Sequence, residues 1–278
     1  MIITVASGKG GTGKTTIATS LALSVARAQF VDADAEEPNA HLFLHPTIEQ
    51  TIPVEMMLPE VDLERCTFCG KCAEFCQFNA LAVIKEKLLV FPELCHGCGG
   101  CVLVCPEKAM REKQRRIGEV EIGSAKGMRF IQGRLKPSEP SSVRIVREEM
   151  AQVNNGMPTV VDAAPGTACA VVETISLADF CLLVTEPTPF GLHDLVMAMD
   201  VAVELGVPSG VVINRSGARD HLIEEACKER GVAVLLKVPF QRAIAEAYSN
   251  GKCLVDAFPE WRQPFRKLFD YIQQELQQ

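Results

Sequence analysis

The chain has 278 residues, of which 47% are hydrophobic, and its formal charge is −7 at pH 7. This length can bury one large α/β core and a small second module, and the acidic balance argues against a broad nucleic-acid interface, which requires a basic surface. No apolar run approaches the roughly 18 residues of a membrane span, and the N-terminus is typical of a strand rather than a signal peptide, so we expect a cytoplasmic protein that does not bind membranes.

A glycine-rich loop follows the first predicted strand, Ile2–Ala6, and precedes a helix predicted from residue 17 to about residue 28. The loop has the pattern G-x-x-x-x-G-K-[ST], in which backbone N–H groups and a helix N-terminus surround phosphates. We expect Lys14 to contact the β- and γ-phosphates of ATP and Thr15 to offer its hydroxyl to Mg²⁺. The predicted nucleotide-binding residues of this loop are Gly8, Lys9, Gly10, Gly11, Thr12, Gly13, Lys14, Thr15 and Thr16.

Two aspartates, Asp32 and Asp34, follow a short predicted strand over residues 29–31. By themselves, two close aspartates are typical of a helix cap or a turn. Together with Lys9, however, they extend a pattern: the loop GKGGTGKT resembles the deviant phosphate loop of MinD/ParA-type ATPases, and D-x-D-x-x-x-x-N resembles the first switch segment of that family. The resemblance implies that Asp34 orients or activates the attacking water and that Asp32 lies near Mg²⁺.

The same resemblance gives Lys9 a role that the residue type alone does not. In this family the lysine reaches across a dimer interface to the partner's nucleotide, which implies a nucleotide-dependent homodimer. Without the resemblance, an exposed lysine with no specific role fits the sequence equally well.

Eight of the 12 cysteines form two copies of C-x-x-C-x-x-C-x-x-x-C. The spacing resembles the ligand runs of bacterial two-cluster ferredoxins, in which the fourth cysteine of each run ligates the other cluster. This resemblance implies one [4Fe–4S] cluster on Cys66, Cys69, Cys72 and Cys105, and a second on Cys95, Cys98, Cys101 and Cys76. Zinc sites usually take two pairs of ligands, and disulfides are disfavoured in a chain without a secretory signal.

Residues around and beyond these runs carry weaker signals. His96, inside the second run, is expected to tune a cluster through a hydrogen bond or charge. Four single cysteines are expected to be small buried hydrophobes; these are Cys169, Cys181, Cys227 and Cys253. Basic residues outnumber acids over residues 108–136, which favours a solvated connecting face, with a docking patch for an acidic redox partner as the alternative.

Three later segments complete the resemblance to the MinD/ParA-type ATPases. A buried strand ends at Asp162 and continues into D-x-x-P-G, which resembles the second switch, with Asp162 as the Walker B acid and Gly166 as a sensor of the γ-phosphate. Asn214 and Arg215 resemble the pair that recognises adenine. Pro239 lies in the segment that, in this family, packs over the adenine ring. The loop over residues 186–191 also follows a strand and is expected to face the same crevice.

An independent argument places these residues together. The phosphate loop, Asp32, Asp162 and Asn214 each follow an apolar, strand-like run. In a parallel doubly wound sheet, ligands bind outside the carboxyl ends of the strands. All four features are therefore expected at one edge of one sheet.

Alternating strand and helix patterns predict an α/β fold with a doubly wound, mainly parallel sheet. Helices are predicted over residues 141–153, 193–205, 219–230 and 242–250, and short strands over residues 81–84, 88–91, 120–122 and 128–131. We divide the chain into a nucleotide-binding domain in two parts, residues 1–59 and 113–278, and an inserted ferredoxin-like domain, residues 60–112. The whole resembles MinD/Mrp-like ATPases with such an insert. Residues 261–278 form an amphipathic pattern, for which a helix packed on the core is favoured over a membrane-binding one.

The leading hypothesis is an ATP-hydrolysing switch with Lys9, Lys14, Asp34 and Asp162 as its catalytic residues. Because the insert lies between the two switch segments, nucleotide state is expected to control electron transfer from its clusters to an unidentified protein partner. Three alternatives remain: an iron–sulfur scaffold or carrier, against which the absence of a C-terminal CPxC motif counts; a positioning ATPase with structural or sensing clusters; and an electron-transfer module with a vestigial ATPase.

Overall fold

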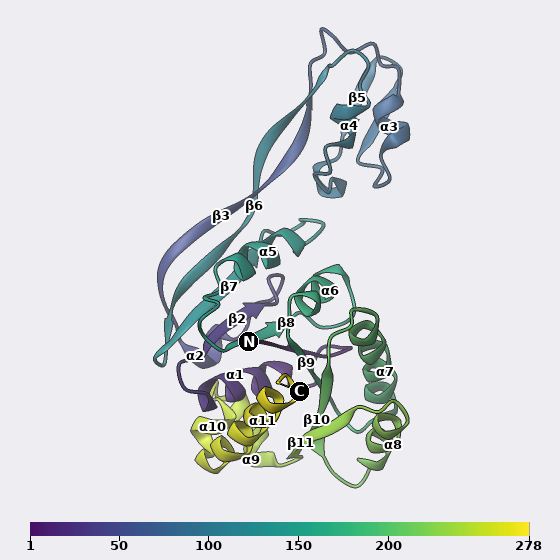
Figure 1. The fold of residues 1–278 in the computed structure, drawn as a ribbon. Helices are drawn as coiled ribbons and strands as arrows, with labels where there is room; N and C mark the ends of the chain where they lie inside the picture. The colour runs from purple at the N-terminus through teal and green to yellow at the C-terminus, as the bar shows by residue number, and fades with distance from the viewer. Residues whose placement is uncertain (278) are drawn as a thin grey trace.

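The computed structural model describes residues 1–277 and shows a helix-flanked sheet from which a long two-stranded ribbon extends to a small second module (Figure 1). The strands are β1 (Ile2–Ala6), β2 (Gln29–Ala33), β3 (Thr47–Val61), β4 (Leu81–Ile84), β5 (Lys87–Val90), β6 (Met110–Ala125), β7 (Met128–Leu135), β8 (Thr159–Ala163), β9 (Phe180–Thr185), β10 (Ser209–Ser216) and β11 (Ala233–Pro239). The helices are α1 (Lys14–Ser24), α2 (His41–Leu44), α3 (Lys71–Phe75), α4 (Gly100–Leu103), α5 (Val143–Ala151), α6 (Cys169–Ser176), α7 (Pro189–Glu204), α8 (His221–Glu229), α9 (Arg242–Ser249), α10 (Leu254–Ala257) and α11 (Arg262–Glu275), with 3₁₀ turns at Pro92–Leu94 and Pro259–Trp261.

The large sheet has nine strands in the order β11-β10-β9-β1-β8-β2-β7-β6-β3. The strands from β11 to β7 pair in parallel, whereas β6 and β3 are antiparallel to their neighbours. This confirms the predicted α/β class with a mainly parallel sheet. Because the inner strands are covered on both faces, their side chains are apolar in both alternating directions, and β8 and β9 are buried throughout.

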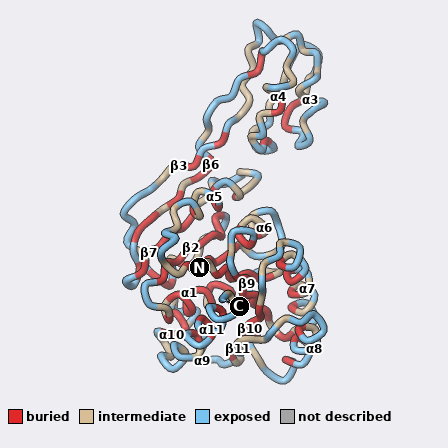
Figure 2. Tube along the Cα trace, viewed as in Figure 1, coloured by how far each residue is buried: buried red, intermediate tan, exposed pale blue. Residues whose placement is uncertain are grey.

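Helices cover the two faces of the sheet separately. On one face, α1, α10 and α11 share a core with Ile3 of β1 and Phe30 of β2. On the other face, α6, α7 and α8 pack against β9 and β10, while α5 packs against β2 and β7 through Ile145 and Val146. The buried residues concentrate in the sheet and on the helix faces that pack against it (Figure 2).

The ribbon formed by β3 and β6 was not predicted. The sequence analysis placed no strand over residues 47–61 and gave only residues 120–122 of β6. The two strands pair from Thr47 opposite Ser124 to Val61 opposite Met110, with register irregularities after Ile48 and after Val54. Residues 47–54 of β3 lie beside the part of β6 that pairs with β7, and the seven residues 55–61 extend beyond the sheet by about 23 Å, at about 3.3 Å per residue.

Ion pairs along the ribbon account for its basic residues. Arg111 and Lys113 both pair with Glu60 across the two strands, and Arg115 pairs with Glu139 near the sheet. These contacts fit the expectation of a solvated connecting face.

Most predicted helices are present within a few residues of their expected ends. The largest difference at a start is in α7, which begins at Pro189 rather than residue 193. Thr188 explains this start, because its hydroxyl accepts a hydrogen bond from the N–H of Gly191 and proline is favoured in the first turn.

The C-terminal amphipathic segment forms α11, and its apolar side faces the core. Phe265 and Ile272 are fully buried, and the helix packs chiefly against α1. Gln278, the last residue of the predicted pattern, lies outside the described residues. No helix within residues 1–277 is both long and apolar enough to cross a membrane.

Candidate functional site

The phosphate loop joins β1 to α1, and two of its glycines are required by their surroundings. Gly13 has a φ of +87°, and a Cβ there would lie 2.1 Å from Nδ2 of Asn214. A Cβ on Gly8 would lie 2.1 Å from the backbone oxygen of Asp194. The loop leads directly into α1, which begins at Lys14, so the free N–H groups of the first helical turn lie where phosphates bind.

A buried ion pair and a second carboxylate lie behind this loop. Nζ of Lys14 is 2.5 Å from Oδ1 of Asp162, and Asp162 lies beside Asp32 because the two residues are partners in the parallel pairing of β8 and β2. Burial, followed by the negative charge of Asp162, raises the pKa of Asp32 to about 7. The other carboxylate oxygen of Asp162 is buried without a hydrogen-bond partner. With Thr15 buried at the start of α1, these oxygens fit a Mg²⁺ ion, which prefers oxygen ligands.

The two switch segments meet next to the same loop. Asp34 of the first switch lines a cleft together with Ala164 and Pro165 of the second. Burial raises the pKa of Asp34 to about 6, although the charge of Lys14 opposes this. Gly166, with a φ of +91°, donates its N–H to the carbonyl of Ser7 at 2.9 Å. The cleft therefore holds a carboxyl group that is more basic than usual, between the two segments predicted to respond to the γ-phosphate.

A cavity of about 240 Å³ lies beside the phosphate loop, at the predicted position of adenine. Its wall includes three predicted residues, Asn214, Arg215 and Pro239, and the Asn214 amide donates to a carbonyl of the loop at 2.7 Å. The further wall residues that the sequence analysis missed include Ile244 and Tyr248 of α9. Their i, i+4 spacing could have shown that they share one helix face.

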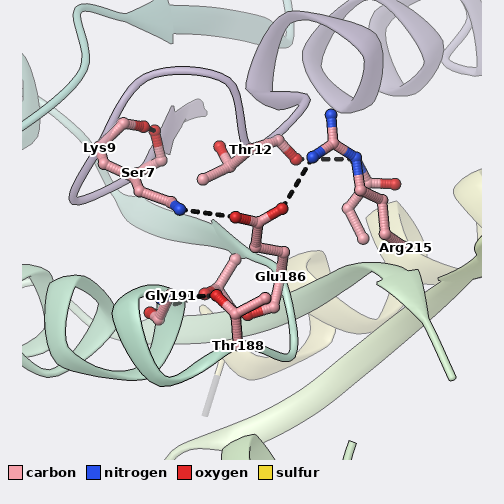
Figure 3. Close-up of polar contacts among 9 residues, drawn as sticks. Ser7, Lys9, Thr12, Glu186, Thr188, Gly191 and Arg215 are labelled. Atoms are coloured by element: carbon pink, nitrogen blue, oxygen red, sulfur yellow. Dashed lines mark hydrogen bonds and ion pairs between the residues drawn. The ribbon is translucent and has the colours of Figure 1, made fainter. Parts of the chain in front are cut away.

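Lys9 is held within its own chain by a residue to which the sequence analysis assigned no role (Figure 3). Its Nζ lies 2.6 Å from one oxygen of Glu186, and the guanidinium of Arg215 lies 2.8 Å from the other. Burial acts against the ionised form of Glu186, but the hydrogen bonds from Lys9 and Arg215 lower its pKa below the usual value. The loop over residues 186–191 does face the nucleotide crevice, and Glu186 links the signature lysine to the adenine side.

The two cysteine runs lie in the module at the end of the ribbon, where they surround two separate cavities. Each cavity combines three cysteines of one run with the fourth of the other. The first, here called the distal cavity, is lined by Cys66, Cys69, Cys72 and Cys105, and the second, the proximal cavity, by Cys76, Cys95, Cys98 and Cys101. No three His, Cys, Asp or Glu side chains within residues 1–277 converge as a single metal ion requires. Four sulfurs spread around a cavity instead suit a ligand of several atoms, and this donor set is that of an iron–sulfur cluster.

The two halves of the module repeat one backbone pattern. The runs are offset by 29 residues, so that Cys76 corresponds to Cys105. Gly70 and Gly99, also 29 apart, precede α3 and α4 with φ values of +80° and +72°. The sulfurs of Cys76 and Cys105 each accept an N–H bond at 3.3 Å from the residue four positions later. Such contacts orient and stabilise thiolate ligands.

The cysteine module has little apolar core, and its interior consists mainly of the two cavities. Of residues 62–109, only five are buried; they are Ala80, Leu81, Cys95, Gly100 and Ala109. Burial raises the pKa of Cys101 to about 11, so a thiolate at this position needs a positively charged ligand.

The proximal cavity faces the nucleotide-binding sheet. His96 lines this cavity and also a cleft of about 580 Å³ between the module and α5, and its ring stacks on Phe78 at 3.9 Å. Cys169, at the start of α6, lines the same cleft. It is exposed, so the expectation that it is a small buried hydrophobe is wrong, whereas Cys181, Cys227 and Cys253 are buried as expected.

The fold and the loop together define a P-loop nucleotide-binding protein of the doubly wound α/β class. The model of the CobQ/CobB/MinD/ParA nucleotide-binding domain matches residues 3–255, and the chain belongs to this family. It is 30% identical over 260 residues to an uncharacterised protein of Methanocaldococcus jannaschii, covering 91% of this chain and 90% of that one.

Two more distant similarities concern the two parts of the chain. The septum site-determining protein MinD of Pyrococcus horikoshii, solved with Mg-ADP, has a TM-score of 0.58 and 18% identity over 96% of this chain and 93% of its own. A stretch of 53 residues is 34% identical to Ferredoxin-1 of Chlorobaculum tepidum, covering 17% of this chain and 86% of that ferredoxin.

Proposed function

We propose that the protein is a Mg²⁺-dependent ATP-hydrolysing switch that carries two [4Fe–4S] clusters and couples its nucleotide state to electron transfer with a protein partner. The observation that carries the proposal is the presence, in one chain, of a complete phosphate loop and of two cavities that each bring together four cysteines. The similarity to Ferredoxin-1 over 53 residues supports the cluster part.

On the nucleotide side, each proposed role follows from position. Lys14 exchanges its contact with Asp162 for the β- and γ-phosphates, which leaves Asp162 and Asp32 available to hold Mg²⁺ with Thr15. Asp34, whose pKa is raised to about 6, is ionised at neutral pH and can accept a hydrogen bond from the attacking water. The Mg-ADP bound to the MinD of Pyrococcus horikoshii supports the same ligand for this chain.

Lys9 can contribute to ATP hydrolysis only when its ion pair with Glu186 is broken. By the family resemblance it acts on the nucleotide of a second copy, so the proposed dimer requires that the Lys9–Glu186 pair opens. A second cation at the phosphates would then stabilise the charge that develops during phosphoryl transfer.

On the cluster side, the chain's own residues supply ligands, orientation and shielding. The distal and proximal cavities place four sulfurs each around a ligand, and backbone N–H groups point at Cys76, Cys95 and Cys105. When bound, [4Fe–4S] clusters supply one-electron redox chemistry at low potential. His96 lies where it can change the hydrogen bonding of the proximal cluster.

The test is a redox titration of anaerobically reconstituted protein with and without Mg-ATP. We expect iron for two clusters and a midpoint shift of about 30 mV or more, which is about threefold in a one-electron equilibrium. Lys14→Ala should abolish both hydrolysis and the shift, whereas Lys228→Ala, on the exposed side of α8, should change neither. Eight iron atoms with no effect of ATP on potential or on electron exchange would contradict coupling. Ready loss of iron to a chelator in the presence of ATP would favour a cluster carrier instead.

A further inference from the structure

Besides the ribbon, the cysteine module touches the nucleotide-binding domain through one hydrogen bond. Nη2 of Arg144, in the first turn of α5, donates to the backbone carbonyl of Gly97 at 3.2 Å. Among the residues that the structure describes, this is the only hydrogen bond between residues 62–109 and the parts of the chain outside the ribbon. Gly97 lies inside the second cysteine run, so the contact is made at the wall of the proximal cavity.

The position of Gly97 leaves little room for independent movement of this loop. Its φ is +62°, and a Cβ there would lie 2.6 Å from the Met56 side chain and 2.9 Å from the carbonyl of Met57. The loop is therefore wedged between β3 on one side and Arg144 on the other. A displacement of Arg144 changes the hydrogen bonding of the backbone that carries Cys95 and Cys98.

Helix α5 is also linked to both switch segments, directly to the first and through α6 to the second. Ser142, immediately before the helix, donates to Glu36 of the first switch at 3.2 Å. One turn further, Arg147 makes two hydrogen bonds to Glu173 of α6, at 2.7 and 2.9 Å. Since α6 begins three residues after Gly166, α5 is linked to the second switch through that helix.

The helix is anchored by buried side chains to the strand that leads into the first switch. Ile145 and Val146 are fully buried in a core shared with Val31 of β2. Glu149, also fully buried, lies so close to β7 that a Cβ on Gly133 would be 2.7 Å from its Oε1. Ser142 immediately precedes this anchored nine-residue helix, and Arg144 and Arg147 lie in its N-terminal part, so a shift that either switch imposes on it is passed to Arg144 rather than absorbed.

We propose that α5 is the element that transmits the state of the switches to the proximal cluster site, and that Arg144 is the positioning residue at its end. This inference rests on the proposed function, because it presupposes that clusters occupy the cysteine cavities. Guanidinium charge near a cluster favours the reduced, more negative form. Loss of Arg144 should therefore lower the potential of the proximal cluster and remove its response to nucleotide, while the distal cluster keeps its potential.

The test compares wild type with Arg144→Ala, Arg144→Lys and Arg111→Ala as full-length, anaerobically reconstituted proteins. Arg111 is a matched control, because it is an exposed arginine of the ribbon that pairs with Glu60 and makes no contact with α5. Each protein is titrated by electron paramagnetic resonance with and without Mg²⁺ and a non-hydrolysable ATP analogue. We expect the threefold nucleotide effect, about 30 mV for one electron, in wild type and Arg111→Ala, a partial effect in Arg144→Lys, and none in Arg144→Ala.

A second readout does not depend on redox chemistry. Hydrogen–deuterium exchange over residues 95–101 should change on analogue binding in wild type and stay constant in Arg144→Ala. Ser142→Ala, which breaks the link to the first switch two residues before Arg144, should weaken the same response if Arg144→Ala fails to retain iron. A full nucleotide effect in Arg144→Ala would overturn the role of α5. No nucleotide effect in wild type would overturn the proposed function itself, and the two failures are thereby distinguished.

Discussion

Glu186 is expected to restrain the dimer on which hydrolysis depends. Its carboxylate holds Lys9 at 2.6 Å and Arg215 at 2.8 Å, with 13% of the Glu186 side chain and 30% of the Lys9 side chain exposed. Lys9 cannot pair with Glu186 and contact the nucleotide of a partner at the same time. Opening the pair is therefore part of the free energy of dimerisation, and replacement of Glu186 by glutamine should reduce that cost.

The size of the effect follows from the partial burial of the pair. Ion pairs with this exposure stabilise a structure by about 1 kcal/mol, because water screens them on one side. A symmetric dimer opens two such pairs, which gives about 2 kcal/mol, or a dimer dissociation constant about 30-fold lower in Glu186→Gln. The glutamine keeps the shape of the side chain and one acceptor oxygen, so Arg215 retains a partner.

Sedimentation velocity with Mg²⁺ and a non-hydrolysable ATP analogue measures this constant directly. Asp200→Asn is the matched control, since it removes a charge of α7 that pairs at 2.5 Å with Arg230, the residue after α8. The control should dimerise as wild type does. An unchanged or weaker dimer in Glu186→Gln would refute the reasoning, because Glu186 would then not compete for Lys9.

Three further predictions concern the first switch, the clusters and the C-terminal helix. Because burial raises the pKa of Asp34 from 3.8 to about 6, its stabilising contribution is complete below pH 3.8 and is lost as pH rises through 6. Asp34→Asn should therefore raise the unfolding free energy by about 1–2 kcal/mol at pH 8, allowing for partial solvent screening, and by less at pH 5, as thermal melts would show. The same variant should abolish hydrolysis, because it removes the carboxylate proposed to orient the attacking water. Cys76→Ser and Cys105→Ser should each lose a different cluster, seen as about half of the iron and one of two paramagnetic signals, whereas Cys169→Ser should keep both; loss of the same signal in both variants would contradict the crossed arrangement. Phe265→Ala should lower the unfolding free energy by about 3 kcal/mol, as urea titration would measure, since this side chain is fully buried against α1; a negligible loss would mean that α11 does not stabilise the core.

The positions of the nucleotide-site residues could be predicted from the sequence because one topological rule fixes them. Asp32, Asp162 and Asn214 each lie at or near the carboxyl end of a strand, and the strands that carry them run parallel in one sheet. A strand-like run and the residues that follow it can be recognised from neighbouring positions in the sequence. Once the sheet is parallel, these features suffice to bring residues up to 182 positions apart, Asp32 and Asn214, to one edge.

The ribbon and the Lys9–Glu186 pair could not be predicted in this way. β3 contains Pro53 and Pro59, which argue against a strand, and its first five residues, 47–51, are all exposed. Only the short alternation of Ile52, Val54, Met56 and Leu58 signals a strand, and it covers less than half of the 15 residues. Its partner β6 begins 49 residues after β3 ends, at Met110. Likewise, Glu186 lies 177 residues from Lys9, and its role depends on side-chain geometry rather than on spacing.

The structure also changes the reason for expecting that bound nucleotide affects the cysteine module. In the sequence, the cysteine runs lie between the two switches, which suggested that they respond to nucleotide. In the fold, β6 pairs with β7 over residues 118–125, and residues 55–61 of β3 carry the module about 23 Å beyond the sheet, away from both switches. Along the ribbon, residues 111–114 of β6 are exposed and the pairing with β3 is irregular between Val54 and Glu55, so a shift in the sheet is not passed rigidly to the module by this route. The module instead folds back toward α5 (Figure 1). Within the described residues, α5 reaches the module at Gly97 and His96, which are wall residues of the proximal cavity. Nucleotide should therefore act on one of two adjacent clusters, which changes the driving force between them and makes electron passage through the module depend on the switch.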